Sequence, residues 1–182
     1  MRGLNMTSIT TYTKKRFDPI LPEEELIDIL DIAHSLSLLC RANGHFPEFY
    51  SVGEHCVNCA CEARARGYSK RIQLACLLHD ASEAYLSDVT RPVKSALPEY
   101  KKIEKNLEAA IYKKWLDSAL TDEEYSLMRE VDDALLYHEM LTYFGEKIYE
   151  KEPVLFSVPL FAFDGFQKTE ERYLTMFEML QS

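Results

Sequence analysis

In the sequence Leu74-Ala75-Cys76-Leu77-Leu78-His79-Asp80-Ala81-Ser82-Glu83, an apolar run leads directly into a histidine and an aspartate. Burying an imidazole and a carboxylate side by side costs several kcal/mol unless something compensates them, and a divalent cation compensates both. The alternative is a helix in which His79 and Asp80 pair with each other, because structural ion pairs resemble functional sites. The segment therefore predicts a helix with either a metal site or an internal ion pair.

Glu83 extends this segment. It stands at i+4 from His79 and at i+3 from Asp80, a spacing that places all three on one face of a helix. A carboxylate in that place is a candidate general base. Asp88 and Lys94 follow within two more turns of chain, so the segment leads into a candidate phosphate-binding loop.

Apolar periodicity and capping residues predict one helix after another. Apolar residues recur at helical spacing, and Pro, Gly, Ser and Thr mark the ends of the periodic stretches. We find no internal repeat and no alternation of strands with helices. The sequence thus predicts an all-α bundle with helices over about residues 23–40, 51–66, 69–86, 90–115, 122–144 and 166–180, the fifth of them capped by Asp122.

Length and composition predict a single domain. A chain of 182 residues with 47% hydrophobic content is long enough to bury one core. We expect one domain over residues 1–182, with the bundle core at about 22–145 and an irregular segment plus a helix at about 150–182. The stretch 152–165 is too apolar for a disordered linker, so we expect it to pack over the bundle or over a partner subunit.

The charge balance restricts the partners. Lys and Arg number 21 against 30 Asp and Glu, which gives a net charge of −9 and a field that repels polyanions. We therefore expect no duplex nucleic acid as a partner, whereas a small phosphorylated molecule can bind where a few cations converge. The sequence shows no signal peptide and no run of about 18 apolar residues. We expect a cytoplasmic protein without membrane association.

The five cysteines are Cys40, Cys56, Cys59, Cys61 and Cys76. The close spacing of three of them suggests a zinc knuckle, but such a site normally uses two separated pairs of ligands and no second pair exists. Cys56, Cys59, Ala60 and Ala63 follow helical spacing instead. This pattern favours small core residues in a reducing compartment.

Two further groups complete a ligand set with His79 and Asp80. His55 lies in the second predicted helix and Asp132 in the fifth. Two imidazoles and two carboxylates from three helices leave positions open for water and substrate, which is typical of a catalytic metal site. Taken alone, His55 also fits a helix-surface histidine, and by residue type the adjacent Asp133 is as good a candidate as Asp132.

With these residues in place, the chain resembles the HD-domain phosphohydrolases, and more closely their bacterial and phage branch of deoxynucleotide hydrolases. That branch includes 5′-deoxynucleotidases and deoxynucleoside triphosphate triphosphohydrolases. The resemblance extends over nearly the whole chain. It rests on Ile32-Ala33-His34-Ser35-Leu36-Ser37, Arg41, Gly44-His45, Tyr50-Ser51-Val52, His55, the segment 79–94, and Asp132 with Glu139.

The resemblance implies roles for these residues. It implies metal ligation by His55, His79, Asp80 and Asp132, and contact of Glu83 with the attacking water. The seven-residue spacing from Asp132 to Glu139 matches the branch and selects Asp132 over Asp133. Gly53-Glu54 before the first ligand resembles monophosphate-cleaving members, but Ala42 follows Arg41 where some members have Trp. Base selectivity therefore does not carry over.

The remaining candidates concern substrate. Arg41, Lys94 and Arg129 are the expected phosphate-binding cations, and Lys94 gains from the free N–H groups of a helix start. Each of the three also fits a solvated surface charge. Asp88 either protonates the leaving 5′-oxygen, holds the sugar or caps a turn. Glu139 contacts sugar or base, or pairs with Arg41.

The other histidines help to define the site. His34 fits a satisfied core histidine, His138 a peripheral one, and His45 follows Asn43-Gly44 in a loop where it can contact substrate. Residues 81–131 contain no histidine, whereas two-metal HD sites generally draw additional histidines from that stretch. We therefore expect a single metal.

The sequence as a whole predicts a phosphohydrolase that uses one divalent metal ion (Mn, Co, Mg, Zn, Ni or Fe) and cleaves the 5′ phosphoester of a small-molecule nucleotide. The leaving group is phosphate or tripolyphosphate. The alternative is a non-catalytic nucleotide-sensing or protein-binding HD module, although a pure binder needs neither Glu83 nor Asp88. The oligomeric state stays open, with a homo-oligomer among the options.

Overall fold

The computed structural model describes residues 7–182, and within that range the fold is all-α, as predicted, apart from one short antiparallel pair of strands. In chain order the elements are β1 (Ile9–Thr10), β2 (Arg16–Phe17), η1 (Glu24–Leu26), α1 (Ile29–Leu38), η2 (Arg41–Gly44), α2 (Val52–Ala65), α3 (Lys70–Leu78), α4 (Glu83–Leu86), α5 (Arg91–Ser95), α6 (Pro98–Leu116), α7 (Asp122–Phe144) and α8 (Phe166–Gln181).

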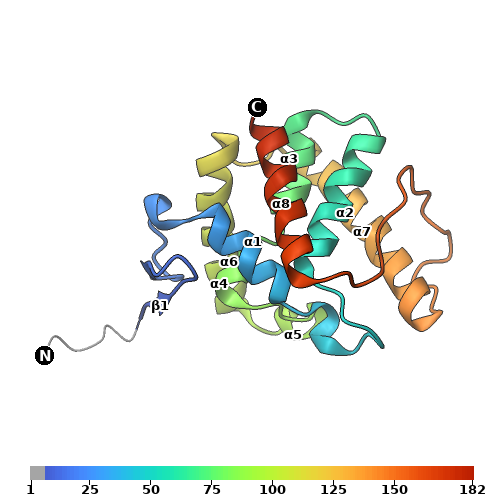
Figure 1. Ribbon diagram of the computed structural model, residues 1–182, viewed down its shortest axis with the longest axis horizontal. Coiled ribbons are helices and arrows are strands. Elements are labelled where there is room, and N and C mark those ends of the chain that lie inside the picture. Colours follow the sequence, from blue (N-terminus) through green and yellow to red (C-terminus); the bar gives the residue numbers. More distant parts are fainter. Residues whose placement is uncertain (1–6) are drawn as a thin grey trace, which may run out of the picture.

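Helix α2 lies at the centre of the bundle. It contacts α1, α3, α7 and α8, and Figure 1 shows α8 running alongside α1 and α2 with α3 behind it. Small buried residues such as Cys56, Ala60 and Ala63 allow these helices to approach closely. Gly53 allows α1 and α2 to pack tightly, because a Cβ atom there would lie 3.1 Å from backbone atoms of Leu36. Every predicted metal ligand lies on α2, on α7 or in the turn that follows α3.

The predicted helix 69–86 is interrupted, which corrects one sequence expectation. Helix α3 ends at Leu78, and the chain tightens into i→i+3 turns in which Ala81 N donates to Leu78 O at 2.9 Å and Glu83 N donates to Asp80 O at 2.9 Å. Glu83 then begins α4. The helical-face argument for Glu83 was therefore wrong, because the backbone between His79 and Glu83 is not a regular α-helix.

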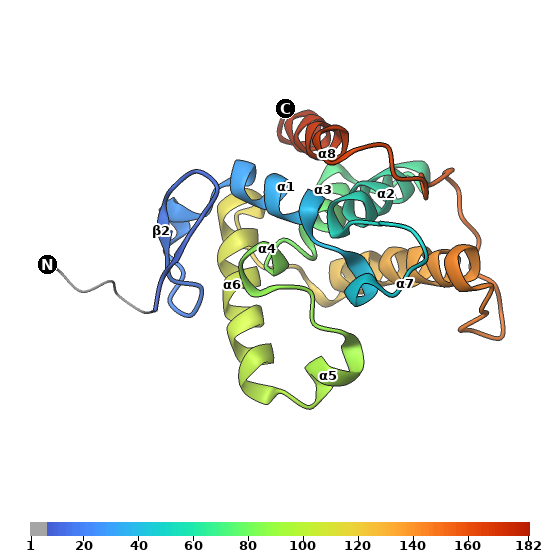
Figure 2. The same cartoon turned by 60° about the horizontal axis from the view of Figure 1, so that its bottom comes forward.

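Other predicted helix boundaries also shift. Helix 90–115 divides into α5 and α6 because Pro98 cannot continue the helix from Leu97, and Figure 2 shows α5 lying apart, near the start of α6. Helix 23–40 divides into η1 and α1, with the Asp28 carboxylate capping α1. Thr121, rather than Asp122, caps α7 through a capping box with Glu124.

The strands β1 and β2 were not predicted, because each is only two residues long. Their connecting turn is fixed to the bundle by Asp31, whose carboxylate accepts hydrogen bonds from Thr13 N at 2.6 Å and Thr13 Oγ1 at 3.0 Å. Phe17 is fully buried and packs against Tyr85, with ring centroids 4.3 Å apart. The hairpin thus covers the end of the bundle beside α1 and α4.

The segment 152–165 packs over the bundle, as expected from its apolar composition. The buried carboxylate of Glu62 on α2 accepts hydrogen bonds from the backbone N–H groups of Phe156 and Ser157 and from Ser157 Oγ. Asn58 bonds the backbone of Leu160 through both its amide nitrogen and its oxygen. Two polar side chains of α2 therefore hold an otherwise irregular segment in place.

Three of the five cysteines lie in the core, as predicted. Cys56, Cys59 and Cys76 are buried, whereas Cys40 and Cys61 are half-buried, and all five are free thiols. Among residues 7–182 we find no helix with the length and apolar character that a membrane span requires.

Candidate metal centre

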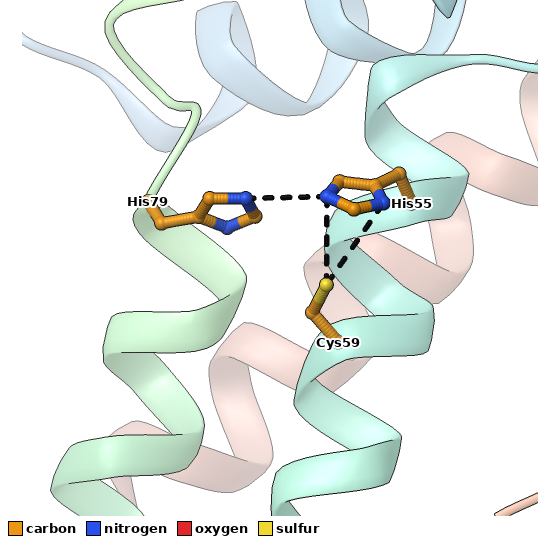
Figure 3. A group of neighbouring side chains, drawn as sticks. All are labelled: His55, Cys59 and His79. Atoms are coloured by element: carbon orange, nitrogen blue, oxygen red, sulfur yellow. Dashed lines mark hydrogen bonds between the residues drawn. The ribbon is translucent and has the colours of Figure 1, made fainter. Parts of the chain in front are cut away.

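Two imidazoles face each other at the junction of α2 and α3. His55 points from α2 and is fully buried, and His79 is the residue that follows the last turn of α3. Their Nε2 atoms lie 3.2 Å apart (Figure 3).

The Nδ1 atoms of both rings are already engaged. His79 Nδ1 lies 2.8 Å from the carbonyl oxygen of Cys76, which can only accept, so this nitrogen carries a proton. His55 Nδ1 donates in the same way to the Glu139 carboxylate at 2.6 Å. Two neutral imidazoles held like this present their Nε2 lone pairs to each other. The pair is stable only with a cation between the rings or an additional proton on one of them.

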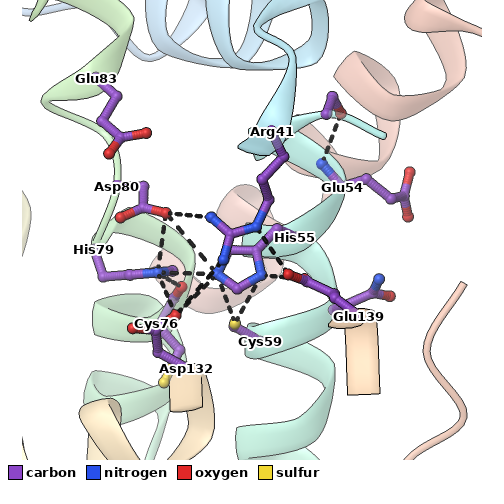
Figure 4. A network of polar contacts seen from close by, with 12 residues as sticks. Arg41, Glu54, His55, Cys59, Cys76, His79, Asp80, Glu83, Asp132 and Glu139 are labelled. Carbon is purple, nitrogen blue, oxygen red and sulfur yellow. Dashed lines mark hydrogen bonds and ion pairs between the residues drawn. The ribbon is translucent and has the colours of Figure 1, made fainter. Parts of the chain in front are cut away.

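Two carboxylates approach the same nitrogens. Asp132 Oδ1 lies 3.2 Å from His55 Nε2 and 3.7 Å from His79 Nε2. Asp80 Oδ2 lies 3.2 Å from His79 Nε2 and 3.9 Å from His55 Nε2 (Figure 4). Two donors that share one ion at about 2.0–2.2 Å each can be no more than about 4.4 Å apart. All four distances meet that condition.

Asp133 takes no part in this arrangement. Its Oδ1 atom lies 3.1 Å from Arg129 Nη2 and 3.3 Å from Arg91 Nη2, on the outer side of α7. Of the two adjacent aspartates, the structure therefore brings Asp132 to the imidazoles and leaves Asp133 in a surface ion pair.

The electrostatic field of the cluster favours a cation. Burial would lower the pKa of His79, but the charge of Asp80 raises it well above its ordinary value. Burial would raise the pKa of Asp132, yet the two histidines hold it well below its usual range. The raised pKa of His79 reflects the negative charge beside it, and the lowered pKa of Asp132 shows that positive charge at the imidazoles stabilises the carboxylates.

Arg41 reaches the cluster from η2. Its Nε atom donates to Glu139 Oε2 at 3.0 Å, and its Nη1 atom lies 3.4 Å from Asp80 Oδ2. Burial would lower the pKa of this guanidinium, but the carboxylates of Glu139, Asp80 and Asp132 raise it well above its ordinary value. Glu139 was predicted either to contact sugar or base or to pair with Arg41, and the structure contains the pair with Arg41. The second carboxylate oxygen of Glu139 orients His55.

A cavity of about 690 Å³ opens onto the cluster. Its walls come from η2, the α3–α4 turn, α5, α6 and α7, and the predicted ligands His79, Asp80 and Asp132 lie in them. His55 lies behind these residues, in the core. The walls also contain the predicted catalytic and substrate residues Arg41, Glu83, Asp88, Lys94, Arg129 and Glu139.

Glu83 lies in this wall as a buried carboxyl group with one oxygen that has no partner among the described residues. Its side chain is 4% exposed, and its Oε2 atom has no hydrogen-bond partner among the described residues, although Oε1 lies 3.4 Å from Lys94 Nζ. Burial, together with the charges of Asp80 and Asp88, raises its pKa well above the ordinary value. A buried carboxyl oxygen without a partner is costly unless a ligand satisfies it.

The predicted phosphate-binding cations lie at the cavity but already have acidic partners. Lys94 Nζ lies 2.6 Å from Glu104 Oε1, and Arg129 Nη1 lies 2.7 Å from Asp132 Oδ2. Both side chains can reach into the cavity from α5 and α7. His45, the remaining predicted substrate contact, is exposed and does not line this cavity.

The two remaining histidines lie outside the cluster. His34 is half-buried, with Nδ1 3.0 Å from Glu170 Oε2 and its ring stacked on Tyr12 at 3.7 Å between centroids. His138 bonds the carbonyl of Pro153 at 2.8 Å. His138 is peripheral to the cluster, as expected, whereas His34 has a partner but is half-buried and not a core residue.

Sequence reasoning missed two residues of the site. Arg91 begins α5, is part of the cavity wall and lies 3.3 Å from Asp133. Cys59 lies one turn after His55 on α2, and its Sγ atom is 3.5 Å from His55 Nε2. Burial raises the pKa of this thiol well above its ordinary value. The i+4 spacing from His55 was the signal that could have identified Cys59.

Comparison with known proteins finds relatives that are themselves uncharacterized. No protein-family model matches the chain. Uncharacterized protein YfdR of Escherichia coli is 38% identical over 110 residues, which cover 60% of this chain and 59% of that protein. Uncharacterized protein RCAP_rcc00048 of Rhodobacter capsulatus is 40% identical over 103 residues, 54% of this chain and 53% of that protein. The chain thus spans little more than half the length of these curated relatives.

Proposed function

We propose that this chain is a metal-dependent phosphohydrolase of the HD-domain kind that cleaves the 5′ phosphoester of deoxynucleotides. The observation that carries the proposal is the convergence of four donor side chains, His55, His79, Asp80 and Asp132, at a cavity of nucleotide size. Two imidazoles and two carboxylates suit a divalent cation with positions left open. A divalent cation supplies two things when bound, a lower pKa for a water molecule and polarisation of a phosphoryl oxygen.

Glu83 is the proposed general base. Its partner-free oxygen belongs to the cavity wall, so it is available to accept a proton from the attacking water. Burial raises its pKa, and a carboxyl group with a raised pKa is a stronger base once ionised. General-base catalysis of this kind contributes about 10²- to 10⁴-fold to a rate.

Asp88 is the proposed general acid. The water oxygen forms the new bond to phosphorus, the bond from phosphorus to the 5′-oxygen breaks, and the leaving oxygen takes a proton from Asp88. Burial, with a contribution from the charge of Asp80, raises the pKa of Asp88 and so favours the protonated form that an acid needs.

The cations of the wall are proposed to hold the phosphate. Lys94 and Arg91 lie on α5, and Arg129 lies on α7, where it shares Asp133 with Arg91. Because the chain carries a net charge of −9, positive potential must be concentrated locally to bind an anion. Each cation exchanges a carboxylate partner for a phosphoryl oxygen when substrate binds.

The apolar part of the wall suits the nucleoside. Phe46, Tyr125, Met128, Leu136 and Met140 lie in the cavity together with the charged groups. Aromatic and thioether side chains pack against the flat face of a base. A phosphorylated ligand with an aromatic portion therefore fits both halves of the cavity.

The deciding experiment is a substrate screen. Metal-free protein would be reconstituted separately with Mg²⁺, Mn²⁺, Co²⁺, Ni²⁺, Zn²⁺ and Fe²⁺ and assayed against all deoxynucleoside mono- and triphosphates. We expect hydrolysis of one class, with release of phosphate or tripolyphosphate. Nucleotide binding at this cavity without turnover under any metal would instead identify a nucleotide-sensing module.

A further inference from the structure

The thiol of Cys59 lies beside the two imidazoles of the donor cluster. Cys59 Sγ lies 3.5 Å from His55 Nε2 and 3.9 Å from His55 Nδ1. The donor atoms of His55, Cys59 and His79 all lie within 4.8 Å of one another (Figure 3). Figure 4 shows Cys59 and Glu83 on opposite sides of the two imidazoles. The imidazoles therefore have Asp80 and Glu83 toward one side, and Cys59 together with Asp132 toward the other (Figure 4).

Two of the three separations among the donor atoms of His55, His79 and Cys59 are close to those of a tetrahedral metal site. With metal–nitrogen bonds of about 2.0–2.1 Å and metal–sulfur bonds of about 2.3 Å, two ligands of one tetrahedral ion lie about 3.3–3.6 Å apart. The two imidazole nitrogens are 3.2 Å apart, and His55 Nε2 is 3.5 Å from Cys59 Sγ. Because Sγ also lies 3.9 Å from His55 Nδ1, it now rests against the ring, and a rotation of the Cys59 side chain brings it to an ion held at Nε2.

We propose that His55, His79 and Cys59 form a second, sulfur-containing mode of cation binding that takes thiophilic divalent ions such as Zn²⁺ and Cd²⁺. Thiolate ligands select soft and borderline cations, whereas Mg²⁺ and Mn²⁺ prefer carboxylate oxygens. On binding, a metal–sulfur bond forms and the thiol proton passes to solvent. Asp132 Oδ1, at 3.2 Å from His55 Nε2, is placed to act as a fourth ligand.

The two modes exclude each other because they use the same imidazole nitrogens. A hard cation is held with Asp80 on the side that Glu83 also occupies, and a thiophilic cation is drawn toward Cys59. Cation binding through sulfur does not depend on the proposed hydrolysis. A chain that binds Cd²⁺ through sulfur and hydrolyses nothing would support this proposal and contradict the proposed function.

The test is a Cd²⁺ titration of the metal-free, reduced full chain. The ultraviolet thiolate-to-cadmium charge-transfer band reports sulfur ligation directly. We expect the band to saturate at one ion per chain and to be lost in Cys59→Ser, with Cd²⁺ affinity lowered at least about tenfold. The matched control is Cys61→Ser on the same helix, which should keep the band. A full band in Cys59→Ser would overturn the proposal.

A second thiol gives a sharper contrast. The donor atoms of Cys56, His79 and Asp80 also lie within 4.8 Å of one another. If the band is lost in Cys56→Ser and kept in Cys59→Ser, the proposed ligand set is wrong. Excess Mg²⁺ should leave the band unchanged in the wild-type chain, because a hard cation competes poorly for a site that includes a thiolate.

One measurement needs no variant, which matters because Cys59 is buried and its replacement can disturb folding. The ¹¹³Cd chemical shift of the loaded wild-type chain distinguishes ligand sets with one sulfur from sets of nitrogen and oxygen alone. We expect the shift of a single-sulfur site. A shift typical of nitrogen and oxygen ligands would contradict the proposal whatever the variants do.

Discussion

Glu139 and His55 form a fully buried hydrogen bond, with 2.6 Å between Oε1 and Nδ1. The same carboxylate accepts from Arg41 Nε at 3.0 Å, so it links η2, α2 and α7 at the base of the cavity. Burial would raise the pKa of Glu139, but Arg41 and His55 keep it below its ordinary value. An ionised Glu139 fixes the His55 tautomer that directs Nε2 toward the cluster.

Replacing Glu139 with Gln should weaken metal binding. The amide can accept from His55 but no longer balances the charges of Arg41 and a bound cation. Because such orienting partners contribute about 10- to 100-fold to metal affinity, we expect a loss in that range. Isothermal titration with Mn²⁺ would measure it. An affinity equal to wild type would show that His55 needs no ionised partner.

Asp132 and Asp133 should differ sharply. Asp132 lies 3.2 Å from His55 Nε2, whereas Asp133 pairs with Arg129 and Arg91 at the surface. We expect Asp132→Ala to lose bound metal and Asp133→Ala to retain it, because a partly exposed ion pair contributes little. Metal content after dialysis, measured by plasma emission, provides the comparison. Equal content in the two variants would remove Asp132 from the ligand set.

Glu83→Gln separates chemistry from binding. Since an amide cannot take up the proton of the attacking water, turnover should fall by about 10²- to 10⁴-fold. Metal content and nucleotide affinity should stay close to wild type, because no predicted ligand is changed. Single-turnover kinetics would test this. A rate within a few-fold of wild type would mean that another group is the base.

Lys94→Ala should raise KM without removing metal. Its ammonium lies 2.6 Å from Glu104 and 3.4 Å from Glu83, and its loss would leave both carboxylates uncompensated in the cavity wall. A phosphate would then meet more negative charge. We expect a larger effect for triphosphate if the longer chain is the substrate. The control is Lys101→Ala on the exposed surface of α6. Unchanged kinetics would place the phosphate elsewhere.

The stability of the fold should depend on pH through Glu62. Burial would raise the pKa of this carboxyl, but hydrogen bonds from Ser157, Arg66 and the backbone of Phe156 lower it in the folded chain. A group with a lowered folded-state pKa stabilises the fold above its ordinary pKa, and that contribution is lost as pH falls through the folded-state value.

We therefore expect Glu62→Gln to unfold more easily at neutral pH, by about 1.5–3 kcal/mol, and to lose less stability than wild type on acidification. Urea melts between neutral and acidic pH would show the difference. Glu123→Gln, on the exposed side of α7, serves as the control. Parallel pH profiles for wild type and Glu62→Gln would exclude this role.

The fold class and the set of donor residues could be predicted from the sequence more fully than the local backbone conformation. Helical spacing predicted the all-α architecture, and the motif resemblance selected His55, His79, Asp80 and Asp132, which the structure brings together. These residues could be identified from the sequence because each lies in or next to a strongly periodic helix. The resemblance, rather than periodicity, separated Asp132 from Asp133.

The rest depends on contacts between distant parts of the chain. The tight turn between His79 and Glu83 cannot be read from local propensity, since the same residues also fit a regular helix. The pairing of Lys94 with Glu104 follows from the break at Pro98, which turns α6 back along α5. Cys59 was assigned to the core because burial and ligation call for the same small side chain at the same spacing.

Helix α5 buries none of its five residues, although it carries both Arg91 and Lys94. Its position over the cavity therefore depends on ion pairs with Glu104, Glu83 and Asp133 rather than on apolar packing. Salt screens partly exposed pairs of this kind but leaves a hydrophobic core intact. We therefore expect rising ionic strength to loosen the contact of α5 with the cavity rim at salt concentrations where the bundle beneath it stays folded.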